Sequence, residues 1–347
     1  MNPIRTAFTL KNGRTIGGNA SVFIVAEIGV NHDGDINKAL TLVDSVAESG
    51  ADAVKVQLLT PEANYAKGHP SYDIFKNVGL EVSLFRKVQE HALSRGLTFF
   101  ATPDTPSLSL VSEWEMPLIK ISSGMITDKP HIEMAARQKV PIVFSSGMSY
   151  LHEVATTIKW ASDCGASDIG FLHCTSLYPA PEDSLNLRAI LGISELGVVA
   201  GYSDHSVGHL ASVTAVGLGA KILEKHVTLD NAAQGPEHHF AADPTSFKEY
   251  VSAIRSVERM LGSGKKEPTE TEEKNRLIFR RCLVAVSDLY SGDILTDHKV
   301  GVLRPNLGTV GMAPEYLDKI IGKTLKRAVL QGNGITLDDL VDPGHKT

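Results

Sequence analysis

The hydrophobic pattern of this chain alternates between short apolar runs and longer segments with helical periodicity. Strand-like apolar runs recur eight times, at residues 21–30, 52–59, 97–103, 117–124, 141–148, 169–176, 197–205 and 221–228. The segments between and after these runs repeat apolar residues every three or four positions, most clearly at 36–50, 83–96, 152–165 and 247–261. Several of them end in glycine, a helix-stopping signal. Eight strands separated by helices predict a (β/α)8 TIM barrel.

Two further segments belong with this barrel. Residues 6–18 predict a small hairpin that turns at Asn12-Gly13. The connection at 60–79 is unusually long and carries aromatic residues, so we expect an ordered lid on the catalytic face, with a disordered insertion as the alternative. A doubly wound open sheet is the competing architecture, but no glycine-rich dinucleotide motif follows the first strand.

The pattern changes after residue 262. Residues 263–278 are polar and charged and contain a proline, which predicts an interdomain linker. Beyond them, short strands and turns replace the helical periodicity. We therefore expect three parts, namely a hairpin plus barrel at 1–262, a linker at 263–278 and a small β-rich domain at 279–347.

Composition and charge narrow the class of protein. The 347 residues carry a net charge of −6 without a basic cluster, so nucleic acid is not an expected partner. The three cysteines, Cys164, Cys174 and Cys282, lack paired spacing, which fits a reducing compartment. No apolar run has the length of a membrane span, and the N-terminus lacks a signal core. We expect a cytoplasmic protein without a membrane partner.

The last two predicted strands end in residues with catalytic potential. Within residues 201–228, one strand ends in Asp204-His205 and the next in Glu224-Lys225-His226. Parallel α/β sheets gather their chemistry at the C-terminal ends of their strands. Two histidines placed there could share one divalent metal ion. Hydrogen-bonded core histidines are the alternative interpretation.

The other predicted strands also end in polar residues, where a plain barrel core holds branched apolar side chains. These residues are Glu27, Asn31, His32, Lys55, Gln57, Thr102, Asp104, Lys120, Ser122, Ser123, Ser145, Ser146, His173, Thr175, Ser176 and Tyr178. A buried lysine is costly unless it meets an anion, so Lys55 and Lys120 indicate a phosphate-bearing substrate, with structural ion pairs as the alternative. Together with the two histidines, they predict metal-assisted chemistry between a phosphorylated molecule and a carbonyl compound. We interpret Cys174 as wall or core, because only His173 accompanies it as an activating group.

These residues lie in motifs that resemble the sialic acid synthase family, which comprises N-acetylneuraminate, legionaminate and pseudaminate synthases and their animal relatives. The matching stretches keep their order along nearly the whole chain: AEIGVNHDGD (26–35), ADAVKVQ (51–57), FFATPDT (99–105), IKISSG (119–124), FSSGM (144–148), LHCTSLYPAP (172–181), GYSDHSVG (201–208), GAKILEKHVTLD (219–230) and GPEHHFAADP (235–244). The C-terminal part is similar to the antifreeze-like (SAF) domain of these enzymes, with VLRPNLG (302–308) as its marker.

The resemblance implies a condensation of phosphoenolpyruvate with C1 of an open-chain N-acyl hexosamine such as N-acetylmannosamine. The products are a nine-carbon 2-keto-3-deoxy acid, such as N-acetylneuraminate, and phosphate. A divalent cation, Mn²⁺ or Mg²⁺, is implied on His205 and His226, and Glu27 is implied to position or deprotonate the water that adds at C2. The residues implied to bind phosphoenolpyruvate are Lys55, Thr102, Lys120, Ser123, Ser145, Ser176 and Ser203. Asp204 and Glu224 are then expected to orient neighbouring histidines or lysines.

The resemblance also implies how the sugar is bound. The side chains implied to face it are Gln57, Tyr178, Glu237 and Arg304. Arg304 matches an arginine that reaches from the SAF domain of one subunit into the barrel of the other, which implies a domain-swapped homodimer.

Three positions, Met125, Ser176 and Glu237, depart from the common family pattern and leave the acceptor sugar open. Met125 favours a less polar sugar, such as a 2,4-diacetamido-trideoxyhexose, so legionaminate or pseudaminate synthesis is the main alternative. Another phosphoenolpyruvate-dependent keto-deoxy sugar acid synthase and a non-catalytic carbohydrate-binding protein are the remaining alternatives.

Overall fold

A computed structural model describes residues 4–341 and divides the chain into two compact units, with the division between Ser263 and Gly264. In the first unit, eight parallel strands close into a barrel in the order β10-β3-β4-β5-β6-β7-β8-β9. The strands are β3 (Phe23–Glu27), β4 (Ala53–Leu58), β5 (Thr98–Pro103), β6 (Ile119–Ile121), β7 (Ile142–Ser145), β8 (Ile169–Cys174), β9 (Val199–Asp204) and β10 (Ile222–His226). The closed order confirms the predicted barrel and excludes the open doubly wound sheet.

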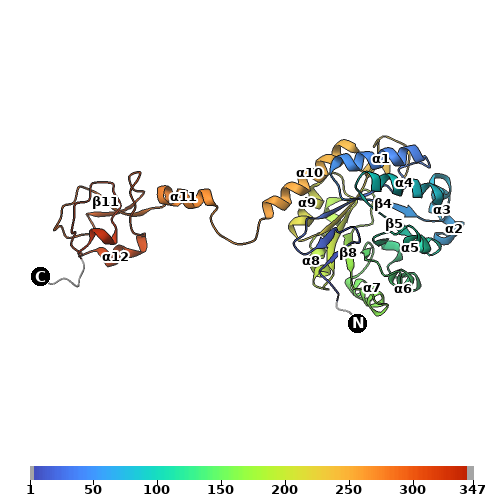
Figure 1. Cartoon of the computed structure of the whole chain (residues 1–347), viewed down its shortest axis with the longest axis horizontal. Helices are drawn as coiled ribbons and strands as arrows, with labels where there is room; N and C mark the ends of the chain where they lie inside the picture. Colours follow the sequence, from blue (N-terminus) through green and yellow to red (C-terminus); the bar gives the residue numbers. More distant parts are fainter. Residues whose placement is uncertain (1–3, 342–347) are drawn as a thin grey trace. The chain divides into compact units, whose positions relative to one another are not determined.

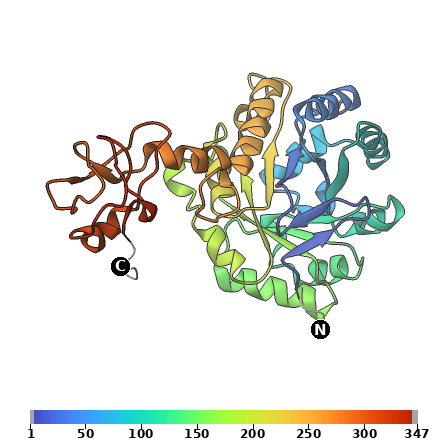
Figure 2. The same ribbon diagram turned by 60° about the vertical axis from the view of Figure 1, so that its left-hand side comes forward.

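Helices surround the strands on the outside of the barrel (Figures 1 and 2). They are α1 (Ile36–Ser49), α4 (Val82–Ser94), α5 (Ser109–Glu113), α6 (Lys129–Ala136), α7 (Leu151–Asp163), α8 (Ala189–Ser194), α9 (Leu210–Gly217) and α10 (Pro244–Leu261). Helix α1 illustrates why these segments are helical. Asp35 caps its N-terminus by accepting from the N–H of Asn37, and its buried residues lie three or four positions apart, on one face. Short 3-10 helices in the barrel connections span Pro106–Leu108, Ser123–Met125, Glu182–Ser184 and His238–Phe240.

The predicted N-terminal hairpin is present and packs against the barrel interior. Strands β1 (Ala7–Thr9) and β2 (Thr15–Gly17) pair antiparallel, with Phe8 opposite Ile16. Phe8, Leu10 and Ile16 are buried in one apolar cluster with inward-facing residues from the N-terminal parts of the barrel strands. The hairpin therefore covers the N-terminal end of the barrel and leaves the C-terminal end open for chemistry.

The long connection at 60–79 contains two helices that the sequence analysis did not predict, α2 (Pro61–Asn64) and α3 (Pro70–Val78). Both begin with proline, which favours the first turn of a helix because its fixed φ and missing N–H cost nothing there. The ring of Tyr65 stacks on Phe75 with centroids 5.4 Å apart. The segment is thus ordered by its own helices and aromatic contacts.

The second unit contains helix α11 (Glu270–Phe279), strands β11 (Cys282–Ala285) and β12 (Val300–Leu303), helix α12 (Leu317–Ile320) and 3-10 helices at Pro314–Tyr316 and Leu337–Asp339. The two strands pair antiparallel beside a small core that includes Leu283, Leu295 and Ile335. Helix α11 lies in the range expected to be a linker. Its capping box, in which Thr269 and Glu272 exchange backbone hydrogen bonds, explains why so polar a stretch is helical. No helix within residues 4–341 is long and apolar enough to cross a membrane.

Candidate active site

Side chains inside the barrel change from apolar to polar towards the C-terminal ends of the strands. Successive strand residues face opposite sides, so Phe23, Val25 and Glu27 of β3 all face inward. The apolar inward positions form one cluster: Phe23, Val25, Ala53, Phe100, Leu118, Val143, Leu172, Val199 and Ile222. The next inward positions along the same strands include Lys55, Thr102 and Lys120. One end of the barrel is therefore a packed core, and the other end carries polar groups.

A cavity of about 440 Å³ occupies this polar end. Thirteen residues expected at the site from the sequence line it: Glu27, Lys55, Gln57, Thr102, Lys120, Ser123, Ser145, Ser176, Tyr178, Ser203, His205, His226 and Glu237. The segment of α2 and α3 adds Tyr65, Ser71 and Phe75 to the wall, and Cys174 lines it as expected. Arg304 lies in the second unit, where its Nε donates to the carbonyl of Phe279 at 3.0 Å.

Lys55 and Lys120 meet in the cavity with two carboxylates, and all four side chains are at most 5% exposed. The Nζ atom of Lys55 contacts Glu27, donates to the hydroxyl of Thr102 at 3.0 Å and lies 3.8 Å from Glu224. The Nζ atom of Lys120 lies 3.0 Å from Glu224. The ion-pair alternative thus holds for both lysines, yet both also face a cavity where an anionic ligand can reach them.

Burial and charge determine the protonation of this cluster. Burial lowers the pKa of Lys55 to about 7, with the positive charge of Lys120 also lowering it and Glu224 opposing the shift. For Glu224, burial acts to raise the pKa of the carboxyl, but Lys120 and Lys55 outweigh it and the pKa is lowered. Lys55 therefore carries an ammonium group that is easily lost near neutral pH, beside a carboxylate that remains ionised.

Hydroxyl groups line the wall next to the lysines. The hydroxyl of Ser123 accepts from the N–H of Gly147 at 3.0 Å, and the buried hydroxyl of Ser145 has no hydrogen-bond partner among the described residues. A Cβ atom on Gly147 would collide with the hydroxyl of Ser176 and lie 2.7 Å from that of Ser123, so a side chain there would displace both hydroxyls. A buried hydroxyl without a protein partner can bond to a polar ligand or to water. These groups are suited to phosphate oxygens.

His205 and His226 lie side by side in the same cavity, with ring centroids 5.4 Å apart. The carbonyl of Thr175 lies 3.0 Å from Nδ1 of His205, and Glu237 Oε2 lies 3.2 Å from Nδ1 of His226. A ring that carries its proton on Nδ1 keeps a lone pair on Nε2 for a metal ion.

The donor set fits an open catalytic metal site. Within residues 4–341, no group of three or more His, Cys, Asp and Glu side chains is arranged to hold one ion. A cation here would therefore have two protein ligands, His205 and His226, and would complete its coordination with water or substrate. An incomplete protein shell is typical of catalytic metals, whereas structural sites are closed. The paired, cavity-facing rings favour this interpretation over core histidines.

Other polar residues at the strand ends hold the structure together outside the cavity. Asp204 faces away from the barrel interior, lies 3.2 Å from Nζ of Lys225 and accepts from the hydroxyls of Ser206 and Ser212. It therefore orients Lys225 and not its neighbour in sequence, His205. Similarly, the side chain of Asn31 donates to the backbone carbonyl of Val227, and that of Asp104 accepts from the backbone N–H of Thr60. The ring of His173 bonds to the backbone carbonyl of Leu185.

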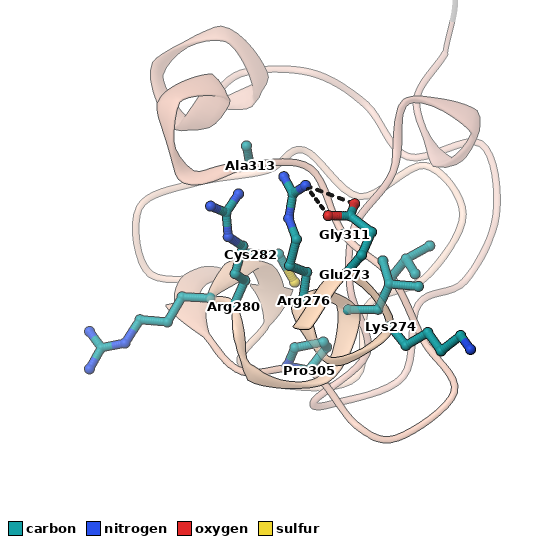
Figure 3. Close-up of a pocket in the computed structure, with 11 residues that line it drawn as sticks. Glu273, Lys274, Arg276, Arg280, Cys282, Pro305, Gly311 and Ala313 are labelled. Atoms are coloured by element: carbon teal, nitrogen blue, oxygen red, sulfur yellow. Dashed lines mark hydrogen bonds and ion pairs between the residues drawn. The ribbon is translucent and has the colours of Figure 1, made fainter. Parts of the chain in front are cut away.

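Met125, expected to influence the choice of sugar, does not line the cavity described here. It packs against the apolar layer between the strands and the outer helices. A separate pocket of about 460 Å³ lies within the second unit, lined by Arg276, Arg280 and other residues (Figure 3). There, Arg276 lies 2.7 Å from both carboxylate oxygens of Glu273, and none of the residues expected at the site lines this pocket. The barrel cavity is the candidate active site.

Sequence reasoning missed some of the residues that shape this site. Glu224 was expected to orient histidines or lysines, and it contacts both Lys55 and Lys120, but its place in the cavity wall was not foreseen. Its position two residues before His226 on one strand was a usable signal, because such residues share a face. Gly147 has no side chain whose chemistry could indicate a role in the site. Tyr65 and Phe75 reach the cavity only because the segment of α2 and α3 packs beside it.

Comparisons with known proteins identify the family. The model of the NeuB family matches residues 42–266, which is more than half of the chain, and the SAF domain model matches residues 280–341. This chain belongs to the NeuB family. The resemblance to sialic acid synthases and the C-terminal SAF domain are thereby confirmed.

Two relatives and one solved structure illustrate how far the similarity extends. The uncharacterized protein MJ1065 of Methanocaldococcus jannaschii is 37% identical over 330 residues, covering 94% of this chain and 97% of that protein. The N,N'-diacetyllegionaminic acid synthase of Legionella pneumophila is 35% identical over 336 residues, covering 91% of this chain and 94% of that protein. The crystal structure of the N-acetylneuraminic acid synthetase from Leptospira borgpetersenii in complex with citrate has a TM-score of 0.74 at 33% identity, covering 79% of this chain and 96% of that chain.

Proposed function

We propose that this NeuB-family chain is a nonulosonic acid synthase, which condenses phosphoenolpyruvate with an N-acyl hexosamine to give a 2-keto-3-deoxy nonulosonate and phosphate. The observation that carries the proposal is one cavity with two unlike halves. Lys55, Lys120 and the serine cluster form an anion-binding half, and His205 and His226 form a metal-binding half. This combination matches a phosphorylated carbon nucleophile that meets an aldehyde.

Phosphoenolpyruvate fits the anion-binding half. Its phosphate and carboxylate need several donors, and Lys55, Lys120, Thr102 and the serines supply them. The serines are Ser123, Ser145, Ser176 and Ser203. Glu224 holds both lysines through ion pairs, and it keeps them in place for the incoming anion.

The acceptor aldehyde belongs beside the histidines. A divalent cation on His205 and His226 would act as a Lewis acid on the aldehyde oxygen. Gln57 and Tyr178 line the same wall and offer hydrogen bonds to the sugar. In the reaction, C3 of phosphoenolpyruvate bonds to C1 of the sugar, water adds at C2, and the C2–O bond to phosphate breaks.

Glu27 is our candidate for handling the added water. Its Oε1 accepts from the N–H of Gly29 at 2.6 Å, and its Oε2 contacts Lys55. These contacts fix the carboxylate at the lysine end of the cavity, where C2 of phosphoenolpyruvate would lie. A carboxylate held there can orient the water or take its proton.

For the acceptor, we propose N-acetylmannosamine, which gives N-acetylneuraminate, with a 2,4-diacetamido-trideoxyhexose as the alternative. The relatives above bear names of both kinds of synthase. Met125 is not among the residues that line the cavity and packs against the apolar layer, so it does not favour one sugar over the other. We also propose that Arg304 completes the sugar site of a second subunit in a domain-swapped homodimer.

The test is product analysis across a panel of acceptors. Purified protein with phosphoenolpyruvate and Mn²⁺ is offered N-acetylmannosamine, its 6-phosphate or a 2,4-diacetamido-trideoxyhexose, and products are identified by mass spectrometry. We expect a nine-carbon 2-keto acid from one free sugar, and its loss with EDTA. Failure of every N-acyl hexosamine to yield such an acid contradicts the proposed function.

A further inference from the structure

The two histidines of the cavity differ in what holds their Nδ1 atoms. Nδ1 of His205 lies 3.0 Å from the carbonyl oxygen of Thr175 and 3.7 Å from Sγ of Cys174. Nδ1 of His226 faces a carboxylate, with Oε2 of Glu237 at 3.2 Å, and the His226 side chain is only 7% exposed. Among the described residues, this buried Nδ1 makes no hydrogen bond of good geometry. The Glu237 carboxylate is close enough to accept one after a small rotation of the ring.

The Glu237 carboxylate is fixed where it meets His226. Its Oε2 accepts from the N–H of Val30 at 3.3 Å. The chain passes it at Gly29, which has a φ of +55°, and a Cβ atom there would collide with the carboxylate and lie 3.3 Å from Nδ1 of His226. The absence of a side chain at Gly29 thus leaves the space in which Glu237 and His226 meet.

The next residue along the chain anchors the loop that carries Glu237. His238 is buried, its Nε2 lies 3.0 Å from Asp33 and its Nδ1 lies 2.7 Å from the hydroxyl of Thr228. Asp33 belongs to the loop after β3, and Thr228 follows β10. The loop is therefore tied to both strands that flank the carboxylate.

We propose that Glu237 is a positioning residue for the metal site: it holds the Nδ1 proton of His226, so that Nε2 faces the cavity as a ligand. A carboxylate on the distal nitrogen fixes the tautomer and ring orientation of a metal-binding histidine and makes the ligating nitrogen more basic. The inference rests on the proposed function for the presence of a metal. It assigns Glu237 a role towards His226 in place of the sugar contact that the sequence predicted.

The geometry separates this role from direct ligation. Within residues 4–341, no third His, Cys, Asp or Glu side chain is placed to share an ion with the two histidines. The contact of Glu237 with His226 is made at Nδ1. With Nε2 as the ligand, the carboxylate therefore acts on the other nitrogen of the ring. Glu237 thus acts through His226.

The test measures metal binding without substrate. The Kd for Mn²⁺ is determined from the electron paramagnetic resonance signal of the free ion for the full chain, Glu237→Gln and Glu237→Ala. Loss of an orienting carboxylate weakens metal sites by about 10- to 100-fold, so we expect the alanine variant within that range and the glutamine variant near its lower end. Gln57→Ala is the matched control, because Gln57 lines the cavity without a bond to either histidine, and its Mn²⁺ affinity should not change.

Turnover adds a second readout. With Mn²⁺ well above its raised Kd, Glu237→Gln should recover the wild-type KM for the acceptor sugar. A KM that stays high at saturating Mn²⁺, with an unchanged Mn²⁺ Kd, marks Glu237 as a sugar contact and overturns the inference. If the wild-type protein itself binds no Mn²⁺, the metal half of the proposed function fails instead. Folding of each variant is checked by circular dichroism, and the glutamine variant preserves the shape of the side chain.

Discussion

Binding of phosphoenolpyruvate should weaken steeply as the pH rises above neutral. Lys55 has a pKa of about 7 because it is buried, so the free site loses this ammonium charge above neutrality. A bound trianion favours the protonated lysine and raises its pKa. Binding is then linked to protonation, and the Kd increases with pH once the free Lys55 is mostly neutral.

The size of the effect follows from that pKa. If the bound complex keeps Lys55 protonated, the Kd scales as one plus the ratio of neutral to protonated Lys55 in the free protein. This ratio rises from about 1 to about 100 between pH 7 and pH 9, so the Kd should increase by about 50-fold. The ligand contributes little over this range, because the second pKa of a phosphate monoester is about 6.

Isothermal titration calorimetry at several pH values, without acceptor, measures this directly. Lys55→Met is the control: it should bind phosphoenolpyruvate weakly at every pH, with a flat profile. In buffers of different ionisation enthalpy, the wild-type protein should take up close to one proton per ligand near pH 8. A Kd that changes by less than about threefold between pH 7 and pH 9 refutes the assignment of Lys55 as the titrating ligand group.

Three further predictions test other parts of the account. Gly147→Ala should raise the KM for phosphoenolpyruvate by about 10-fold or more, because the added methyl group collides with Ser176. Gly217→Ala is the control and should leave the KM unchanged, because a Cβ atom there meets no atom within 4 Å. Equal effects of the two substitutions would contradict the serine cluster as the phosphate site. Ile16→Ala should lower the free energy of unfolding, measured by urea denaturation, by about 2–5 kcal/mol and leave the Kd for phosphoenolpyruvate unchanged. Leu93→Ala, at an exposed position, is the control for the loss of stability. An unaltered denaturation midpoint of Ile16→Ala would count against the hairpin as part of the core. Arg304→Ala mixed with Lys120→Met should regain activity that neither has alone if sites are shared between subunits, and no regain over a range of mixing ratios would contradict the swapped dimer.

The barrel could be predicted from sequence because its strands are buried on both faces. A strand such as β4 reads as a continuous apolar run broken only by Lys55 and Gln57, and the helix after β3 has a clear buried stripe with an aspartate cap. Helices α2, α3 and α11 were missed for the opposite reason. They bury few side chains, so they lack an apolar stripe, and their signals are local: proline at the first turn, or the Thr269–Glu272 capping box.

The candidate site was predictable where a polar residue interrupts an apolar strand, as at Glu27, Lys55 and Lys120. Partners across the barrel were not predictable, because the Glu224 contacts with Lys55 and Lys120 depend on how the closed barrel brings β10, β4 and β6 together. The same applies to Met125, whose place in the motif pointed to the substrate although its side chain packs into the apolar layer.

The central claim is that one cavity joins phosphoenolpyruvate to a sugar aldehyde, and phosphate release tests it most directly. Purified protein is incubated with phosphoenolpyruvate and Mn²⁺, with and without the acceptor sugar that the product analysis selects, and inorganic phosphate and 2-keto acid product are both quantified. The account predicts one phosphate per molecule of nine-carbon acid, with release that requires the acceptor and is lost in Lys120→Met. Phosphate release that does not depend on the acceptor, or no release with any N-acyl hexosamine, would contradict it.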